Sequence, residues 1–81
     1  MRVRVLLFAA ARELAGADTF DVELSDSATV ADLLARLLVE EPKLAALVER
    51  SRVAVNSEVV APDTLIRPSA EVALIPPVSG G

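Results

Sequence analysis

Residues 29–42 read TVADLLARLLVEEP, and this stretch contains the strongest periodic signal in the chain. Thr29 and Asp32 have the residue types and spacing of a helix N-terminus, and Pro42 would end the helix. A helix whose large apolar residues lie on one stripe must bury that stripe against another layer of structure. We therefore predict one main helix packed across a sheet, with a stripe formed by Val30, Leu33, Leu34, Leu37 and Leu38.

Two strands are expected before this helix. Residues 1–8 alternate at their start and then become fully apolar, and residues 19–24 place apolar side chains on one face only. Good helix-forming residues favour a short helix over residues 9–15, and Gly16 is placed to stop it. We predict that the two strands pair antiparallel across this connection.

The second half of the chain is expected to complete the sheet. A short helical stretch is predicted for residues 43–50. Residues 52–55 and 58–60 have the pattern of two strands joined by a turn at Asn56, because asparagine tolerates the positive φ that hairpin turns need. The last strand, residues 71–75, is apolar enough to lie inside the sheet beside the first. This order predicts an α+β roll, with a mixed sheet packed on one main helix.

Composition limits the functions that the chain can perform. It has 81 residues, which suit one domain, and 53% of them are hydrophobic, so some apolar surface can be left over for a partner. The net charge of −4 argues against nucleic-acid binding. The chain has no cysteine and no histidine, which argues against disulfides, zinc sites and histidine catalysis. Its longest early apolar run is too short for a signal peptide or a membrane span, so we expect a cytoplasmic protein.

The chain ends PPVSGG, and this ending is its most informative functional feature. We divide the chain into a folded domain, residues 1–75, and a flexible, extended functional tail, residues 76–81, which reaches about 20 Å when extended. Two terminal glycines give a narrow end that can enter another protein's active site. A terminal carboxylate becomes reactive once it is joined to AMP, after which a sulfur nucleophile or an amine can displace the AMP. The same ending could be a simple floppy terminus, so the residues alone support only an accessible C-terminus.

Four segments resemble the small subunit of molybdopterin synthase. They are VRVLLFAAARELAG at residues 3–16, TVADLLARL at 29–37, VAVNSEVV at 53–60 and EVALIPPVSGG at 71–81. The resemblance implies a ubiquitin-like β-grasp fold. It also implies that an E1-like adenylyltransferase uses ATP and magnesium to adenylate the terminal glycine, which is then converted to a thiocarboxylate with sulfur from a sulfurtransferase. The tail that carries the thiocarboxylate would give its sulfur to cyclic pyranopterin monophosphate during molybdenum cofactor biosynthesis.

The same resemblance assigns roles to individual residues. Gly81 would be the residue that is modified, and Gly80 would be its unhindered neighbour. Phe8 and Ile75 would contribute to an apolar docking surface, although Phe8 ends an apolar strand and is also a candidate for a place in the core. The large synthase subunit would have an entry channel for the tail, and the tail residues that line this channel would be Pro76, Pro77, Val78 and Ser79.

The resemblance further implies an assembly of two small and two large subunits. The catalytic side chains are expected on the large subunit, and this chain is expected to bind no metal or cofactor of its own. Two other uses of an activated tail stay open. One is a ubiquitin-like modifier attached to other proteins, and the other is a sulfur carrier for thiamine or cysteine biosynthesis.

Overall fold

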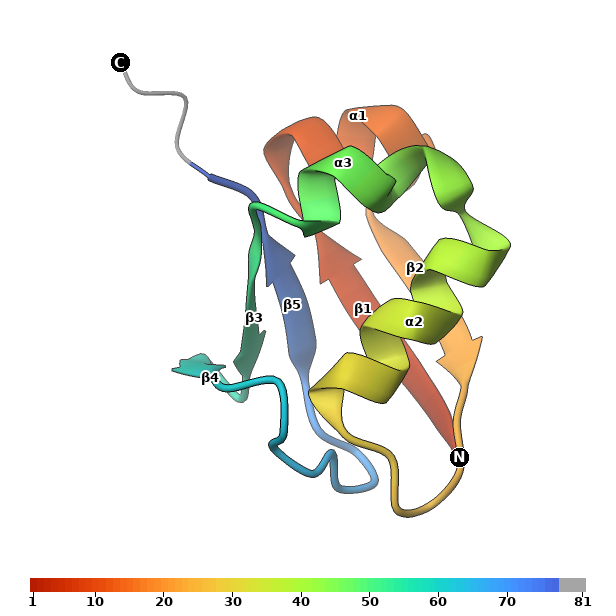
Figure 1. The fold of residues 1–81 in the computed structure, drawn as a ribbon, viewed down its shortest axis with the longest axis vertical. Coiled ribbons are helices and arrows are strands. Elements are labelled where there is room, and N and C mark those ends of the chain that lie inside the picture. The colour runs from red at the N-terminus through yellow and green to blue at the C-terminus, as the bar shows by residue number, and fades with distance from the viewer. Residues whose placement is uncertain (78–81) are drawn as a thin grey trace.

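The computed structural model describes residues 1–77, which form a five-stranded sheet with its helices on one side and at one end (Figure 1). All the predicted helices and strands are present, and the strand boundaries differ from the predicted ones by at most one residue. The elements in chain order are β1 (Arg2–Leu7), α1 (Ala9–Ala15), β2 (Thr19–Glu23), α2 (Val30–Glu40), η1 (Pro42–Leu44), α3 (Ala45–Val48), β3 (Arg52–Val55), β4 (Glu58–Val60) and β5 (Val72–Ile75).

The strands lie in the order β2-β1-β5-β3-β4. The central strand, β5, is parallel to its neighbour β1, and every other neighbouring pair is antiparallel. The predictions that β1 pairs antiparallel with β2, and that the last strand lies inside the sheet beside the first, are both confirmed. Because β1 and β5 are at opposite ends of the sequence, their pairing closes the domain, and it fixes where the chain leaves the sheet.

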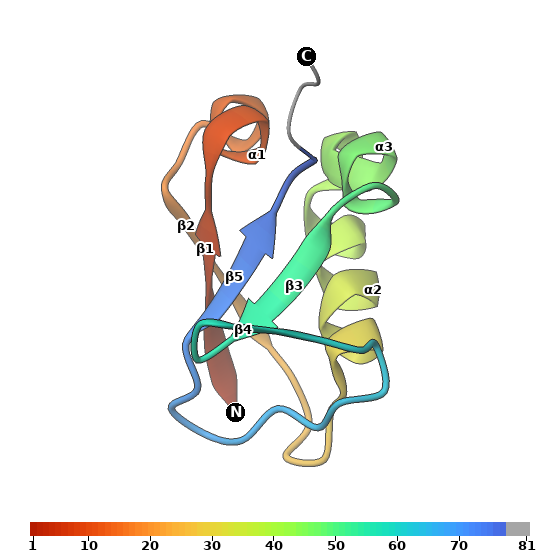
Figure 2. The same cartoon turned by 90° about the vertical axis from the view of Figure 1, so that its left-hand side faces the viewer.

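The helix α2 lies along one face of the sheet (Figure 2), and its apolar stripe packs into the core, as predicted. Its first turn is closed by a capping box, in which Thr29 Oγ1 accepts from the Asp32 backbone N–H and Asp32 Oδ2 accepts from the Thr29 backbone N–H at 2.9 Å. Three residues of the stripe are fully buried and two are half-buried against the core. The buried ones are Val30, Leu33 and Leu37, and the half-buried ones are Leu34 and Leu38.

The segment after α2 continues the core at the end of the sheet. It forms η1 and α3, which confirms the helical stretch expected there, and its buried side chains are Leu44, Leu47 and Val48. No helix within residues 1–77 is long and apolar enough to cross a membrane.

Two turns use backbone conformations that the sequence made plausible. Gly16, at φ 72°, ends α1 and donates its N–H to the Arg12 carbonyl oxygen at 2.9 Å. Asn56 and Ser57, at φ 51° and 70°, make the two-residue turn between β3 and β4, where positive φ at both positions matches the twist of a hairpin. The Asn56 side-chain oxygen also accepts from the Glu71 backbone N–H at 2.9 Å, so it ties this turn to the start of β5.

Candidate functional site

The tail begins where β5 ends. Ile75 is the last residue of β5, and Pro76 and Pro77 follow it. Proline has no backbone N–H, so neither residue can extend the hydrogen-bonded ladder of the sheet. This point lies at the end of the sheet near α1 and α3, whereas the loop after β4 lies at the opposite end (Figures 1 and 2). The predicted site residues Val78, Ser79, Gly80 and Gly81 lie outside the described residues.

Phe8 and Ile75, predicted as docking residues, are brought together by the pairing of β1 with β5. Leu7 is opposite Leu74, and both are buried in the core. Continuing this register by one residue brings Phe8 opposite Ile75. Because successive side chains on a strand point to opposite faces, these two point away from α2. Phe8 is 48% exposed and Ile75 is 39% exposed, so neither is a core residue.

A second row of apolar residues extends this surface across the sheet. Leu6 pairs with Ala73, Ala73 pairs with Ala54, and Ala54 pairs with Val59 on β4. Val59 is 52% exposed. We define the apolar docking face as these two rows on the outer side of the sheet, consisting of Leu6, Phe8, Ala54, Val59, Ala73 and Ile75.

Four residues of this face were not predicted from the sequence, and Val59 is the most exposed of the large ones. The four are Leu6, Ala54, Val59 and Ala73. Val60, the neighbour of Val59, points to the opposite face of the sheet and packs against the core. Val59 and Val60 therefore place one apolar side chain on the outer face and one on the core face. A reader of the sequence could notice that the outward position is apolar. Only the strand order β1-β5-β3-β4 shows that it lies on the same face as Phe8 and Ile75.

The other half of the outer face is charged. Arg2 Nε lies 3.2 Å from Glu23 Oε1, and Arg4 Nε lies 3.1 Å from Asp21 Oδ1, across the antiparallel pair β1 and β2. The hydrogen bond to Asp21, together with its negative charge, raises the pKa of Arg4 above the ordinary arginine value. These exposed pairs remain well solvated. The half of the outer face next to the tail is apolar, whereas the other half carries ion pairs. The apolar half is therefore the one suited to a protein partner.

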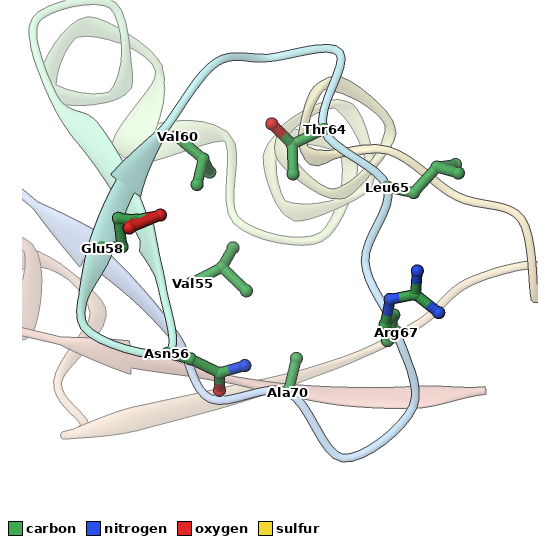
Figure 3. Close-up of a pocket in the computed structure, with 8 residues that line it drawn as sticks. All are labelled: Val55, Asn56, Glu58, Val60, Thr64, Leu65, Arg67 and Ala70. Atoms are coloured by element: carbon green, nitrogen blue, oxygen red, sulfur yellow. The ribbon is translucent and has the colours of Figure 1, made fainter.

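A pocket of about 310 Å³ lies elsewhere on the surface, between β4 and the loop that follows it (Figure 3). It contains none of the predicted site residues. Its Asn56 side chain already accepts a backbone hydrogen bond, and its Leu65 side chain is 61% exposed. Within residues 1–77, no group of three or more histidine, cysteine, aspartate or glutamate side chains is placed to hold a metal ion. The strongest candidate site is therefore the start of the tail together with the apolar docking face.

A mixed sheet with parallel first and last strands at its centre, one main helix across its face and a C-terminal extension defines a ubiquitin-like β-grasp protein, as predicted. A model of the ThiS family matches residues 5–81. The molybdopterin synthase sulfur carrier subunit of Chlamydomonas reinhardtii is 40% identical over 83 residues, covering 100% of both chains. This chain therefore belongs to the ThiS family, and the predicted resemblance to molybdopterin synthase small subunits is confirmed.

Solved structures agree with the fold. The crystal structure of SAMP1 from Haloferax volcanii is 34% identical, with a TM-score of 0.91, and each chain covers 100% of the other. A subunit from a complex of subunits 1 and 2 of the molybdopterin-converting factor of Helicobacter pylori is 23% identical, with a TM-score of 0.72 and 100% coverage of both chains. At that identity, the second likeness speaks for the fold alone.

Proposed function

We propose that this chain is a sulfur carrier that serves as the small subunit of molybdopterin synthase, with Gly81 as the residue that carries the sulfur. The observation that carries the proposal is the full-length, 40% identity to a sulfur carrier subunit of that synthase. The position of the tail supports it, because β5 ends beside an exposed apolar face. The folded domain would bind the partner proteins and present the tail to them, and the chemistry would take place on the main chain of the tail.

The proposed reaction begins at the Gly81 carboxylate. An E1-like adenylyltransferase, with ATP and magnesium, joins the carboxylate to AMP and releases pyrophosphate. A sulfurtransferase then supplies the sulfur that replaces AMP and leaves a thiocarboxylate. Glycine suits both steps because no side chain hinders attack at its carbonyl. At the large subunit each thiocarboxylate gives one sulfur to cyclic pyranopterin monophosphate, and water returns Gly81 to a carboxylate. Two loaded chains are needed for each dithiolene, because a dithiolene contains two sulfur atoms.

The large synthase subunit would hold the tail and cover the apolar docking face. Pro76, Pro77, Val78 and Ser79 would line its entry channel, and Gly80 would pass beside the reacting group. The 40% identical relative is named as the sulfur carrier subunit of a synthase, which supports a second, larger subunit as the partner of this chain. The proposal includes an assembly of two small and two large subunits in the cytoplasm.

A ubiquitin-like modifier is the second candidate, because one observation favours it. Two crystal structures of small archaeal modifier protein 1 from Haloferax volcanii are 34% and 32% identical, with TM-scores of 0.91 and 0.87. Both functions use an activated C-terminal glycine, so the folded domain does not distinguish them. The product of activation does.

Intact mass spectrometry tests the proposal. The purified chain is incubated with the activating enzyme, a sulfurtransferase, ATP, magnesium and a sulfur source. We expect the mass to rise by about 16 Da, the difference between sulfur and oxygen in the terminal group. Heavier conjugates that retain this chain, without the thiocarboxylate, would favour the modifier instead. An unchanged mass with an activating enzyme that is active on a known carrier would contradict both.

Ile75→Asp is expected to weaken binding to the large subunit roughly thirtyfold, equivalent to about 2 kcal/mol. The substitution places a charge on the apolar docking face where the tail begins, and a partner that covers this face would have to remove the water around that charge. Isothermal titration calorimetry against the large subunit measures the loss. Leu65→Asp is the matched control, because Leu65 is 61% exposed on the loop after β4 and should bind normally. Equal affinity of the two variants would show that the apolar docking face is not the interface.

A further inference from the structure

A surface hollow of about 350 Å³ lies at the start of the tail. Its lining combines the last residues of the described chain with two arginines. Ile75, Pro76 and Pro77 form its apolar side, and Arg50 and Arg52 form its basic side. Arg52 pairs with Ile75 across β3 and β5, so their side chains are direct neighbours on the outer face of the sheet. The basic side of the hollow is therefore continuous with the apolar docking face.

The arginines in this hollow differ from most cations of the chain. The sequence has eight lysines and arginines, and five of them form ion pairs with carboxylates in the described part of the chain. The other three have no such pair there, and two of these three line the hollow. The paired cations are Arg2, Arg4, Arg12, Arg36 and Lys43, and the three others are Arg50, Arg52 and Arg67.

This placement is informative because carboxylates are abundant. The chain has twelve acidic residues for eight basic ones, so a cation at a random surface position readily finds a partner. Glu49 even precedes Arg50 in the sequence, yet within residues 1–77 no ion pair joins them. Two adjacent positive charges thus stand at the point where the tail begins, on a protein that is otherwise acidic.

Docking would change the environment of these arginines. A protein that encloses the tail must approach Ile75 and Pro77, and it would then remove water from the adjacent guanidinium groups. Desolvating a charge is costly unless an opposite charge and hydrogen-bond acceptors replace the lost water. Arginine is also the cation that interfaces favour, because its planar group can bind a carboxylate with two hydrogen bonds.

We propose that Arg50 and Arg52 form an acid-recognition site that binds carboxylates at the mouth of the channel that receives the tail. This inference rests on the proposed function and specifies the surface of the partner. The mouth of its channel must carry carboxylates next to an apolar patch. The pair would steer the two proteins together and orient the tail toward the opening. It is separate from the chemistry at Gly81.

The test measures binding of the full-length chain to the large synthase subunit at two or more salt concentrations, by surface plasmon resonance. We expect the double variant Arg50→Gln/Arg52→Gln to bind about tenfold more weakly at low salt, mostly through a slower association rate. The difference from the wild type should shrink as salt rises, because salt screens the attraction. Arg67→Gln is the matched control, since it removes an arginine that has no ion pair in residues 1–77 but lines the pocket after β4.

The charge-conserving double variant Arg50→Lys/Arg52→Lys should keep the association rate within about twofold of the wild type, because steering depends on charge. The proposal is overturned if the glutamine pair binds like the wild type at every salt concentration. It is also overturned if the lysine pair associates as slowly as the glutamine pair at low salt, because both lysines keep the positive charge. A wild-type chain that does not bind the large subunit at all would instead count against the proposed function.

Discussion

Removal of Gly81 is expected to abolish sulfur transfer while leaving the fold intact. The shortened chain still ends in a glycine carboxylate, but that carboxylate stops about 3.5 Å short of its normal position. A displacement of reacting atoms by even 1 Å can cost about 10²-fold in rate, so we expect a loss of at least that size. The measurement is formation of the dithiolene product from cyclic pyranopterin monophosphate, with the large subunit and the activating system present.

Two further measurements separate loss of chemistry from loss of structure. The midpoint of urea unfolding should be unchanged in the shortened chain, because the core is built from residues before Pro76. Gly80→Val should also impair transfer, although it keeps a terminal Gly81, because a branched side chain beside the reacting carbonyl obstructs a narrow channel. Normal dithiolene formation by the chain without Gly81 would disprove the assignment of this residue as the sulfur carrier.

The sequence predicts the frame of this fold well where local chemistry and burial agree. The stripe on α2 has helical spacing, a Thr29 cap and a proline end, and each of these points to the same helix. The hairpin after β3 was predictable for a similar reason, since Asn56 accepts the positive φ that a two-residue turn requires. The central position of β5 was predictable from its apolar residues. Only Val72 and Leu74 are buried, however, because the helices cover one face of the sheet and leave Ile75 exposed on the other.

The site was predictable only in part, because it is assembled from residues distant in sequence. Phe8 could belong either to the core or to the surface from its sequence position, and only the register with β5 decides between them. Arg52 lies beside Ile75 through the pairing of β3 with β5, and Val59 joins the same outer face through the pairing of β4 with β3. A single sequence does not encode strand order in any local pattern, so the extent of the apolar docking face and the basic pair beside the tail emerge only in three dimensions.

Ala9 is a local feature that propensity did not predict. It has a φ of 48°, in the left-handed region that alanine rarely adopts, immediately after Phe8 and at the start of α1. The sequence around it favours an ordinary helix start. The tight connection from β1 into α1 requires this conformation, so the demands of the tertiary fold override the local preference at the edge of the apolar docking face.

Leu37→Ala is expected to destabilise the domain by about 3 kcal/mol, the usual size for a buried leucine whose removal leaves a cavity. Leu37 lies in the second half of α2, is fully buried, and belongs to the core cluster. A domain of this length has a total stability of about 4–12 kcal/mol, so the substitution removes a large share of it. Urea denaturation monitored by circular dichroism measures the change, and the midpoint should fall by about 2 M.

Val39→Ala on the same helix is the matched control, because Val39 is 71% exposed and alanine has the higher helix propensity. Its free energy of unfolding should stay within about 0.5 kcal/mol of the wild type, the range of an ordinary surface substitution. The Leu37→Ala molecules that remain folded should still accept sulfur, because the tail lies outside the core. The substitution lowers the fraction of folded protein and leaves the reactivity of the tail unchanged. Equal unfolding midpoints for the two variants would show that the stripe on α2 does not hold the domain together.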